Sequence, residues 1–385
     1  MDVLDRSMMP MLHNDETEFP LTRNPSMKSA GIATYTQNVS DIRVSDLPVP
    51  EPGPGQIRVR MLMSPVNPSD LNFVHGTYHA ALLRIIWNQG HADGAQVYYD
   101  PDLKTACPQP PFALGGEGMG IVDATGSGWL ARRLLDKRVA IASGPPNGTW
   151  QEYTVVDAKR AVALPSEISD EQGAMFFVNP VTAYVLTREV LRVPRAAWLL
   201  LTAAGSALGK SIVRMARLYG FKTLCVVRSG VNCGELQSLG ADAVVETDRQ
   251  DLIAEVFRIT GGKGVTYALD CVGGELSSKV VRCLGLNGRL VMYGTLADEP
   301  MQIPIRDLMM PVANISGFLL PNWMAQQSPL KLLGVLRQVK KLTIKGVFDT
   351  QVGQRFPLDG VVDAVAASLQ TGRTGKIMLD IGDWR

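Results

Sequence analysis

The stretch that decides the fold is LLLTAAGSALGKSIVRMARLYG, residues 199–220. It opens on an unbroken apolar run of the kind that a strand buried on both faces requires. Small residues follow from Ala203 to Gly209, and the pattern then takes a helical period that ends at Gly220. A buried strand, a turn of small residues and a helix form the first unit of a doubly wound α/β sheet.

The sequence downstream of this unit repeats the same alternation. Strands are predicted at 221–229, 242–247, 264–273, 288–295 and 314–321, with helices at 233–241 and 251–260. Strands that alternate with helices imply right-handed crossovers and a parallel sheet. We therefore predict a doubly wound, Rossmann-type dinucleotide-binding domain over residues 179–322, entered through a helix at 170–191.

The sequence upstream has a different pattern, in which short strands are separated by turns such as EPGPG, residues 51–55. Strands are predicted at 31–36, 42–50, 56–66, 118–125, 137–143 and 151–156. This density of strands and turns predicts an antiparallel, partly open barrel. Beyond Asn322 only helices and the strand at 375–381 remain, so we expect them to return to the barrel, which then comprises 27–178 and 323–385.

Two segments fit neither domain. Residues 1–26 precede the regular strand pattern and are expected to form a loosely ordered extension. Residues 79–111 combine a helix-like start, HAALLRIIWNQ, with a long loop-like remainder, so they are interpreted as an insertion in the barrel domain.

Composition excludes several classes of protein. The chain has 385 residues, 46% of them hydrophobic, with 38 basic and 37 acidic side chains, so its net charge of +1 gives no reason to expect nucleic acid or an anionic membrane as partner. The apolar runs fall short of the roughly 18 residues that a membrane span needs. The first 19 residues carry acids without an apolar core, so neither a secretory signal nor a transit peptide is expected.

Five cysteines without a C-x-x-C pair favour a reducing compartment, and we predict a cytoplasmic protein.

The turn at 203–209 is a candidate dinucleotide site, because backbone N–H groups and the helix dipole can hold a pyrophosphate there. Its glycine pattern is incomplete, since Ala203 and Ala207 stand where glycines are expected, so a tight turn in any α/β domain is an equal alternative. Nineteen positions after Gly209 the second strand ends at Arg228 without an acid. A guanidinium at that point pairs with a 2′-phosphate and favours NADPH over NADH, although a solvated arginine also fits.

At this point a family resemblance can be stated. The chain resembles the medium-chain dehydrogenase/reductase superfamily, and within it the zinc-independent branch of trans-2-enoyl-thioester reductases. The resemblance runs from about Met27 to Asp380 and implies a GroES-like barrel beside the Rossmann domain. It rests on eight pieces in order: SPVNPSDLNFVHGTYH, LGGEGMGIV, GTWQEYTVV, FVNPVTAY, DCVGG, GRLVMYGTLA, GFLLPNW and TGKIML.

The resemblance also implies chemistry without a metal. Zinc-dependent relatives have Cys where this chain has Asn67 and His where it has Gly116, and the cysteine cluster of their structural zinc is absent. Without thiolate or imidazole ligands at those positions we expect no catalytic zinc. Reduction of an activated double bond needs none, because a conjugated carbonyl accepts the electrons as an enolate.

Residue roles carry over position by position. Tyr78 matches the family's catalytic tyrosine, and a phenolic O–H there would stabilise the enolate and help to deliver a proton. Asn67 and Trp323 are expected at the substrate. The residues expected to contact NADPH are Asn179, Gly205, Ser206, Ala207, Leu208, Arg228, Ser229, Gly230, Tyr293, Gly294, Thr295, Leu296, Phe318, Leu319, Leu320 and Lys376.

The sequence is compatible with three functions. The first is NADPH-dependent reduction of a 2-enoyl thioester carried by CoA or by an acyl carrier protein, in fatty acid or polyketide metabolism. The second is reduction of a quinone, an alkenal or another enone. The third is an NADPH-binding scaffold or sensor without turnover.

The resemblance further implies a homodimer formed through the edge strand of the sheet near Gly288 to Tyr293. The 79–111 insertion, directly after Tyr78, is expected to act as a lid or to reshape the acyl pocket. The family often has tryptophan at the position of Leu319 and a charged side chain at that of Gly230, so we expect this chain to differ there.

Overall fold

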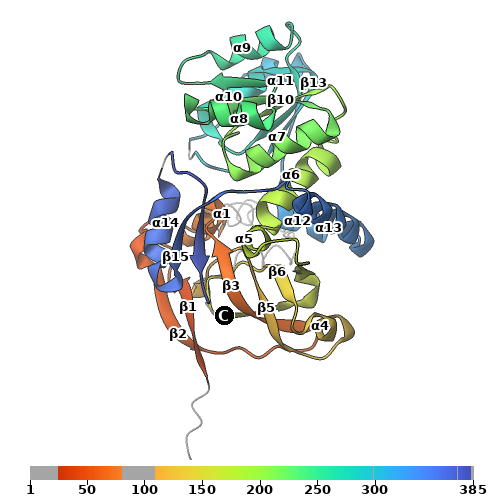
Figure 1. Ribbon diagram of the computed structural model, residues 1–385. Coiled ribbons are helices and arrows are strands. Elements are labelled where there is room, and N and C mark those ends of the chain that lie inside the picture. Colours follow the sequence, from red (N-terminus) through yellow and green to blue (C-terminus); the bar gives the residue numbers. More distant parts are fainter. Residues whose placement is uncertain (1–24, 80–108, 298, 371, 383–385) are drawn as a thin grey trace, which may run out of the picture.

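The computed structural model describes residues 25–79, 109–297, 299–370 and 372–382. Residues 1–24 of the predicted N-terminal extension and residues 80–108 of the predicted insertion lie outside the described residues, whereas Ser26, the last residue of the predicted extension, begins β1. The described chain forms two lobes, a Rossmann lobe at the top of Figure 1 and a barrel lobe below it.

The Rossmann lobe is built on a six-stranded parallel sheet in the order β11-β10-β9-β12-β13-β14. This order confirms the doubly wound arrangement that the alternating pattern predicts. The strand β9 lies at its centre, and Leu199, Leu200 and Leu201 are completely buried. The strands are β9 (Trp198–Leu201), β10 (Lys222–Val227), β11 (Ala243–Glu246), β12 (Val265–Asp270), β13 (Leu284–Met292) and β14 (Asn314–Gly317). The helices are α7 (Ala207–Tyr219), α8 (Cys233–Leu239), α9 (Leu252–Ile259), α10 (Gly274–Arg282) and α11 (Ile305–Met309).

The edge of this sheet is not the strand that the sequence indicates. Residues 288–293 were expected at the edge, but β13 pairs with β12 on one side and with β14 on the other. The prediction is wrong because the strand predicted at 314–321 forms as β14 and pairs on the outer side of β13, with Arg289 paired to Asn314 and Met292 to Gly317. The exposed edge is therefore β14.

The barrel lobe contains a seven-stranded and a three-stranded sheet. The C-terminal strand β16 pairs antiparallel with β3, so this strand lies in the barrel sheet. The strands are β1 (Ser26–Ile32), β2 (Arg43–Pro48), β3 (Gln56–Pro65), β4 (Phe112–Ala113), β5 (Glu117–Thr125), β6 (Arg138–Ala142), β7 (Tyr153–Asp157), β8 (Ala161–Ala163), β15 (Val352–Pro357) and β16 (Lys376–Asp380). The helices are α1 (Pro68–Val74), α4 (Trp129–Leu134) and α14 (Val361–Leu369).

The first predicted strand, 31–36, is displaced toward the N-terminus. The strand β1 ends at Ile32, because the following residues bond to α1 and its end instead of to a neighbouring strand. The Thr36 N–H donates to the Val74 carbonyl at 3.0 Å, and the Thr36 carbonyl bonds to Nδ1 of His75 at 2.9 Å.

The helix predicted at 170–191 is broken in two. The first part is α5 (Asp170–Ala174), and the second runs from Phe177 to Val190 with α6 (Thr182–Tyr184) at its centre. The break has a specific cause, because the Phe177 and Val178 N–H groups donate to Glu117 Oε2 at 2.9 and 2.8 Å. Pro180 adds to the break, since it has no N–H to donate.

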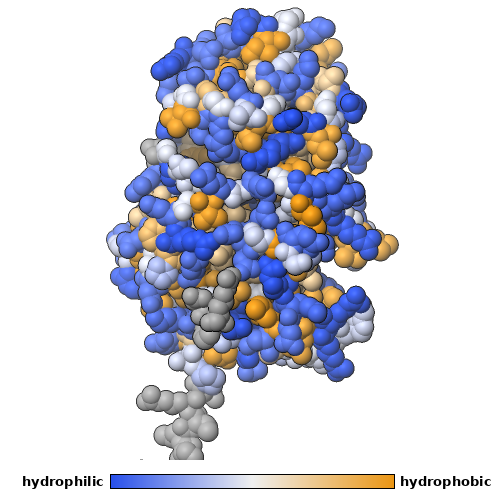
Figure 2. Space-filling view, in the orientation of Figure 1, coloured by the Kyte–Doolittle hydropathy of each residue, from blue (hydrophilic) through white to orange (hydrophobic). Residues whose placement is uncertain are grey.

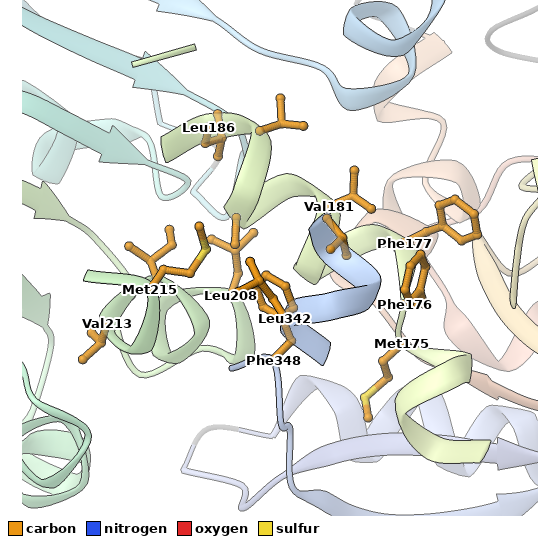
Figure 3. Close-up of a cluster of buried hydrophobic side chains, with 14 of the residues drawn as sticks. Met175, Phe176, Phe177, Val181, Leu186, Leu208, Val213, Met215, Leu342 and Phe348 are labelled. Atoms are coloured by element: carbon orange, nitrogen blue, oxygen red, sulfur yellow. The ribbon is translucent and has the colours of Figure 1, made fainter. Parts of the chain in front are cut away.

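One apolar cluster joins the two lobes. Figure 3 shows side chains of α7, the broken helix and α13 (Pro329–Ile344) meeting around Leu208, Val181 and Leu342. Met175, Phe176 and Phe177 extend the same cluster toward the barrel. The short helix α12 (Leu320–Ala325) precedes α13. The face shown in Figure 2 is largely hydrophilic with scattered apolar side chains. Two further clusters of buried apolar side chains form the cores of the barrel lobe and of the Rossmann lobe.

Candidate active site

The turn between β9 and α7 has the features that a pyrophosphate requires. Ser206 caps α7, its Oγ accepting from the Gly209 N–H at 3.1 Å. The first N–H groups of a helix have no partner within the helix, and the positive end of the helix dipole lies beside them. Ser206 is exposed and Gly205 and Ala207 are half-buried, so the turn is open to a ligand.

The loop after β10 meets this turn. A Cβ on Gly205 would lie 2.5 Å from Nδ2 of Asn232, so a larger residue does not fit without displacing that amide. Arg228, which follows β10, is exposed, and its carbonyl accepts from the Asp248 N–H at 3.0 Å. Ser229 and Gly230 are exposed as well. The turn and the ends of β10 and β11 thus converge at the carboxyl edge of the sheet, where doubly wound folds bind dinucleotides.

The residues predicted around the nicotinamide follow β13 and β14 at the same edge. The Tyr293 N–H donates to the Asp270 carbonyl and the Phe318 N–H to that of Met292, both at 2.8 Å. Desolvation raises the pKa of the Tyr293 hydroxyl well above the ordinary value. Its phenol is therefore a neutral hydrogen-bonding group at physiological pH.

The remaining residues of this set divide by exposure. Phe318, Leu320, Tyr293 and Trp323 pack against the cluster that joins the lobes. Asn179, in the broken helix, and Gly294 are half-buried. Thr295, Leu296 and Leu319 are exposed.

The barrel lobe carries a buried polar cluster, formed by Asn67, Asp70, Glu117 and Lys376 and called here the Glu117 cluster. Each is at most 5% exposed. Lys376 Nζ donates to Asn67 Oδ1 at 2.5 Å, and Asn67 Nδ2 donates to Glu117 Oε1 at 3.1 Å. The Asn67 N–H donates to Asp70 Oδ2 at 2.8 Å. Because Glu117 also accepts from the Phe177 and Val178 N–H groups, the cluster connects the barrel to the broken helix.

Burial dominates the electrostatics of this cluster. It raises the pKa of Asp70 to about 7, against the opposing pull of backbone hydrogen bonds and the Lys376 charge. It raises the pKa of Glu117 and lowers that of Lys376 to about 8. The cluster therefore has groups that titrate around neutral pH, a feature common at functional sites and in buried ion-pair networks.

Two predicted site residues belong to this cluster. Asn67 is only 2% exposed and both ends of its amide are bonded, so it holds neighbours in place. Lys376, expected to contact the cofactor, donates to Asn67. The sequence analysis did not select Asp70 or Glu117. The signal that could have found them is a single acid among uncharged residues, in VNPSD for Asp70 and in LGGEG for Glu117.

Tyr78 lies just beyond α1. Its ring is half-buried and packs edge-on against Phe73, with centroids 5.2 Å apart. Asn67 caps the opposite end of α1, whose seven residues span about 10 Å at 1.5 Å each. The nearby histidines are engaged elsewhere, His75 with the Thr36 carbonyl and His79 in a stack on Tyr35 at 5.2 Å.

A search for metal ligands within the described ranges finds no group of three or more His, Cys, Asp or Glu side chains that could hold an ion. In the same ranges, no helix is long and apolar enough to cross a membrane.

Fold and site together define a two-lobed oxidoreductase, in which a dinucleotide edge of a Rossmann sheet accompanies a GroES-like barrel. Comparison with known families gives the same result: residues 53–166 match the alcohol dehydrogenase GroES-like domain, and residues 207–334 match the zinc-binding dehydrogenase domain. The chain belongs to the medium-chain dehydrogenase/reductase superfamily, in the branch of its enoyl reductases and quinone reductases.

Individual relatives support this assignment. A mitochondrial enoyl-acyl-carrier-protein reductase of Caenorhabditis elegans is 30% identical over 73% of this chain and 74% of its own. The enzyme of that name from Dictyostelium discoideum is 28% identical over 84% of this chain and 86% of its own. Among solved structures, a putative NADPH:quinone reductase from Bacillus thuringiensis is 27% identical, with a TM-score of 0.81 over 93% of this chain and 100% of its own.

Proposed function

We propose that this chain reduces the C2=C3 double bond of a 2-enoyl thioester with NADPH, without zinc, and that Tyr78 is its catalytic residue. The observation that carries the proposal is the position of Tyr78, half-buried beyond α1 in a chain whose relatives named as enoyl reductases match it over most of their length. The thioester carrier is CoA or an acyl carrier protein, as the names of those relatives suggest.

The cofactor is bound by the edge of the Rossmann sheet. The turn at Gly205–Leu208 donates N–H groups to the pyrophosphate, and Arg228 pairs with the 2′-phosphate. Tyr293, Phe318 and the residues that follow them form the wall of the nicotinamide pocket. When bound, NADPH supplies the hydride for the β-carbon of the substrate.

Tyr78 acts on the substrate carbonyl. As hydride reaches the β-carbon, the electron pair of the double bond moves toward the thioester oxygen. The Tyr78 O–H donates to that oxygen and stabilises the enolate. A proton then adds to the α-carbon, and the double bond becomes a single bond.

The second candidate is a quinone or alkenal reductase. It is favoured by the similarity to the Bacillus thuringiensis structure, which is described as a putative NADPH:quinone reductase. Its substrates are also reduced by hydride, but a quinone offers no thioester carbonyl that depends on Tyr78.

The two candidates are separated by the oxidation of NADPH with crotonyl-CoA and with a soluble quinone. Tyr78→Phe should lower kcat with crotonyl-CoA about 100-fold, as loss of one oxyanion donor does elsewhere, and leave quinone reduction unchanged. The control is Tyr153→Phe, a tyrosine of the barrel strand β7 to which no role in the reaction is assigned. Its ring packs under Arg58, with the guanidinium carbon 5.5 Å from the ring centroid. Full activity of Tyr78→Phe with crotonyl-CoA would contradict the proposal, and absence of turnover with every enone would favour the sensor alternative.

The same proposal includes a homodimer. The edge strand β14 is flanked by exposed apolar side chains, Leu286, Ile305, Met309, Met310 and Val312. Exposed apolar groups beside an unpaired strand are typical of a subunit interface, and a second copy of this edge would cover them. Sedimentation of the full chain would give the mass of a dimer; a monomer at micromolar concentration would contradict this part of the proposal.

We also propose that the protein is located in the cytoplasm. Cys225, Cys233, Cys271 and Cys283 are free thiols, as a reducing compartment requires. The relatives are described as mitochondrial, so fractionation of cells that express the full tagged chain is the decisive measurement. Recovery with mitochondria would contradict the cytoplasmic location.

A further inference from the structure

The end of β10 has no acid in the sequence, but the fold brings one to it from the neighbouring strand. Glu246 is the last residue of β11, and the parallel register pairs it with Val227, directly before Arg228. The two strand ends are bonded further, with the Thr247 N–H donating to the Val227 carbonyl at 2.9 Å. Glu246 therefore lies beside the pocket proposed for the adenosine ribose.

The carboxylate of Glu246 reaches Gly230. A Cβ on Gly230 would lie 2.8 Å from Oε2 and 3.2 Å from Oε1, so the carboxylate occupies the space that a side chain at position 230 would take. Here the charge beside the predicted phosphate contacts, Arg228 to Gly230, is negative and comes from another strand.

One oxygen of this carboxylate lacks a hydrogen-bond donor. Oε1 accepts from the Cys233 thiol at 3.4 Å, whereas Oε2 is buried and has no hydrogen-bond partner among the described residues. Arg249 Nη1 is 4.0 Å from Oε2, too far for a hydrogen bond, and the Arg249 side chain is 80% exposed. A buried acceptor without a donor costs free energy, and a ribose hydroxyl is a donor of suitable chemistry.

On this basis, and resting on the proposed function, we propose that Glu246 sets the dinucleotide preference. Its carboxylate accepts a ribose hydroxyl of NADH and repels the 2′-phosphate of NADPH, while Arg228 attracts that phosphate. The opposed charges lower the discrimination between the two cofactors, so the chain uses NADH as well as NADPH.

The test uses the adenosine halves of the cofactors, so that binding is measured without turnover. Calorimetry at low salt compares 2′,5′-ADP with 5′-AMP on the full-length wild type and on Glu246→Gln. The substitution keeps the shape and removes the charge. We expect it to tighten 2′,5′-ADP about tenfold, because a like charge beside the proposed phosphate contacts is removed, and to leave 5′-AMP unchanged or weaker. The gain should shrink as salt is added.

Two further variants make the result specific. Glu246→Ala should also raise the ratio of the two affinities, which separates the charge from the amide that glutamine introduces. Glu255→Gln is the matched control, since the side chains of Glu246 and Glu255 are both 22% exposed and each lies three residues from a paired arginine. It should change neither affinity.

The outcomes are distinct. If both Glu246 variants leave the ratio of the affinities for 2′,5′-ADP and 5′-AMP at the wild-type value, Glu246 does not set the dinucleotide preference and the inference is overturned. The proposed cofactor pocket is not contradicted by that result. If Arg228→Gln leaves 2′,5′-ADP binding unchanged, or neither ligand binds the wild type, the cofactor pocket itself is wrong and the inference falls with it. The steady-state counterpart is the ratio of kcat/KM for NADPH and NADH with one enoyl substrate, which Glu246→Gln should raise about tenfold.

Discussion

On the barrel side of the site, Glu117 is fully buried and its carboxylate accepts from one side chain and two backbone N–H groups. On the Rossmann side, Arg228, Ser229 and Gly230 are exposed, and one oxygen of the nearby Glu246 carboxylate has no hydrogen-bond donor in the part of the chain that the structure describes. The barrel side is held in place by its own contacts, so changes there should act first on folding. The Rossmann side is completed by a ligand, so changes there should act on binding.

The largest effect is expected from Glu117→Ala, which tests whether the barrel side is held in place by the Glu117 cluster. The variant removes the carboxylate whose charge most raises the pKa of the buried Lys376, and it leaves two N–H groups of the broken helix without their acceptor. Removal of one partner from a buried ionic network costs about 3–5 kcal/mol, so the free energy of unfolding in urea should fall by that amount.

Glu275→Ala is the control for this experiment. The Glu275 side chain is 82% exposed and pairs only with Lys279, so the expected change is within about 0.5 kcal/mol. A loss below about 1 kcal/mol for Glu117→Ala would mean that the cluster does not hold the barrel side together.

The second experiment tests the titration of the cluster. Since the pKa of Asp70 is raised to about 7, the folded chain keeps a proton that the unfolded chain loses near pH 4. The contribution of Asp70 to stability is therefore most favourable below about pH 4, declines as the pH rises to about 7 and is constant above it. Urea midpoints of the wild type minus those of Asp70→Asn should follow this curve. A difference independent of pH between 4 and 7 would contradict the raised pKa.

The smallest effect on folding is expected on the Rossmann side. Arg228→Gln should change the free energy of unfolding by less than about 0.5 kcal/mol, because the side chain is exposed. It should nevertheless reduce the rise in Tm that NADPH produces, since the ligand stabilises only through its affinity for the folded chain. Arg258→Gln, on the exposed face of α9, serves as the reference. A loss of several kcal/mol for Arg228→Gln would remove the distinction between the two sides.

Much of this architecture could be predicted because its signals are local. The apolar run at Leu199–Leu201, the small residues of the turn and the period of α7 lie within one short stretch, so the Rossmann lobe and its strand type follow from it. The return of the C-terminal strand could be inferred because the remaining elements were too few for a separate domain.

The features that escaped prediction depend on contacts between distant residues. The helix at 170–191 breaks because Glu117, about 60 positions earlier, binds two of its N–H groups. Glu246 was not considered as a ribose contact because the expected acid belongs to β10, and only the register of β11 brings another to its end. The edge of the sheet was misassigned although a strand was predicted at 314–321, because the order of strands depends on the pairing of β13 with β14, which the pattern of either strand alone does not show.

The pairing of β16 with β3 has a consequence for the order of synthesis. The pair Met378–Pro65 and the bond from Lys376 to Asn67 join parts of the chain more than 300 positions apart. The strands β9 to β14 emerge from the ribosome within one stretch of chain and can pair at once. The Met63–Pro65 end of β3, in contrast, stays unpaired on one side until residues 378–380 have been made. The lobe that is translated first is thus the one completed last, and until then β3 keeps an unpaired edge at Met63–Pro65, beyond its pairing with β7 at Gln56–Arg60, for a chaperone to protect.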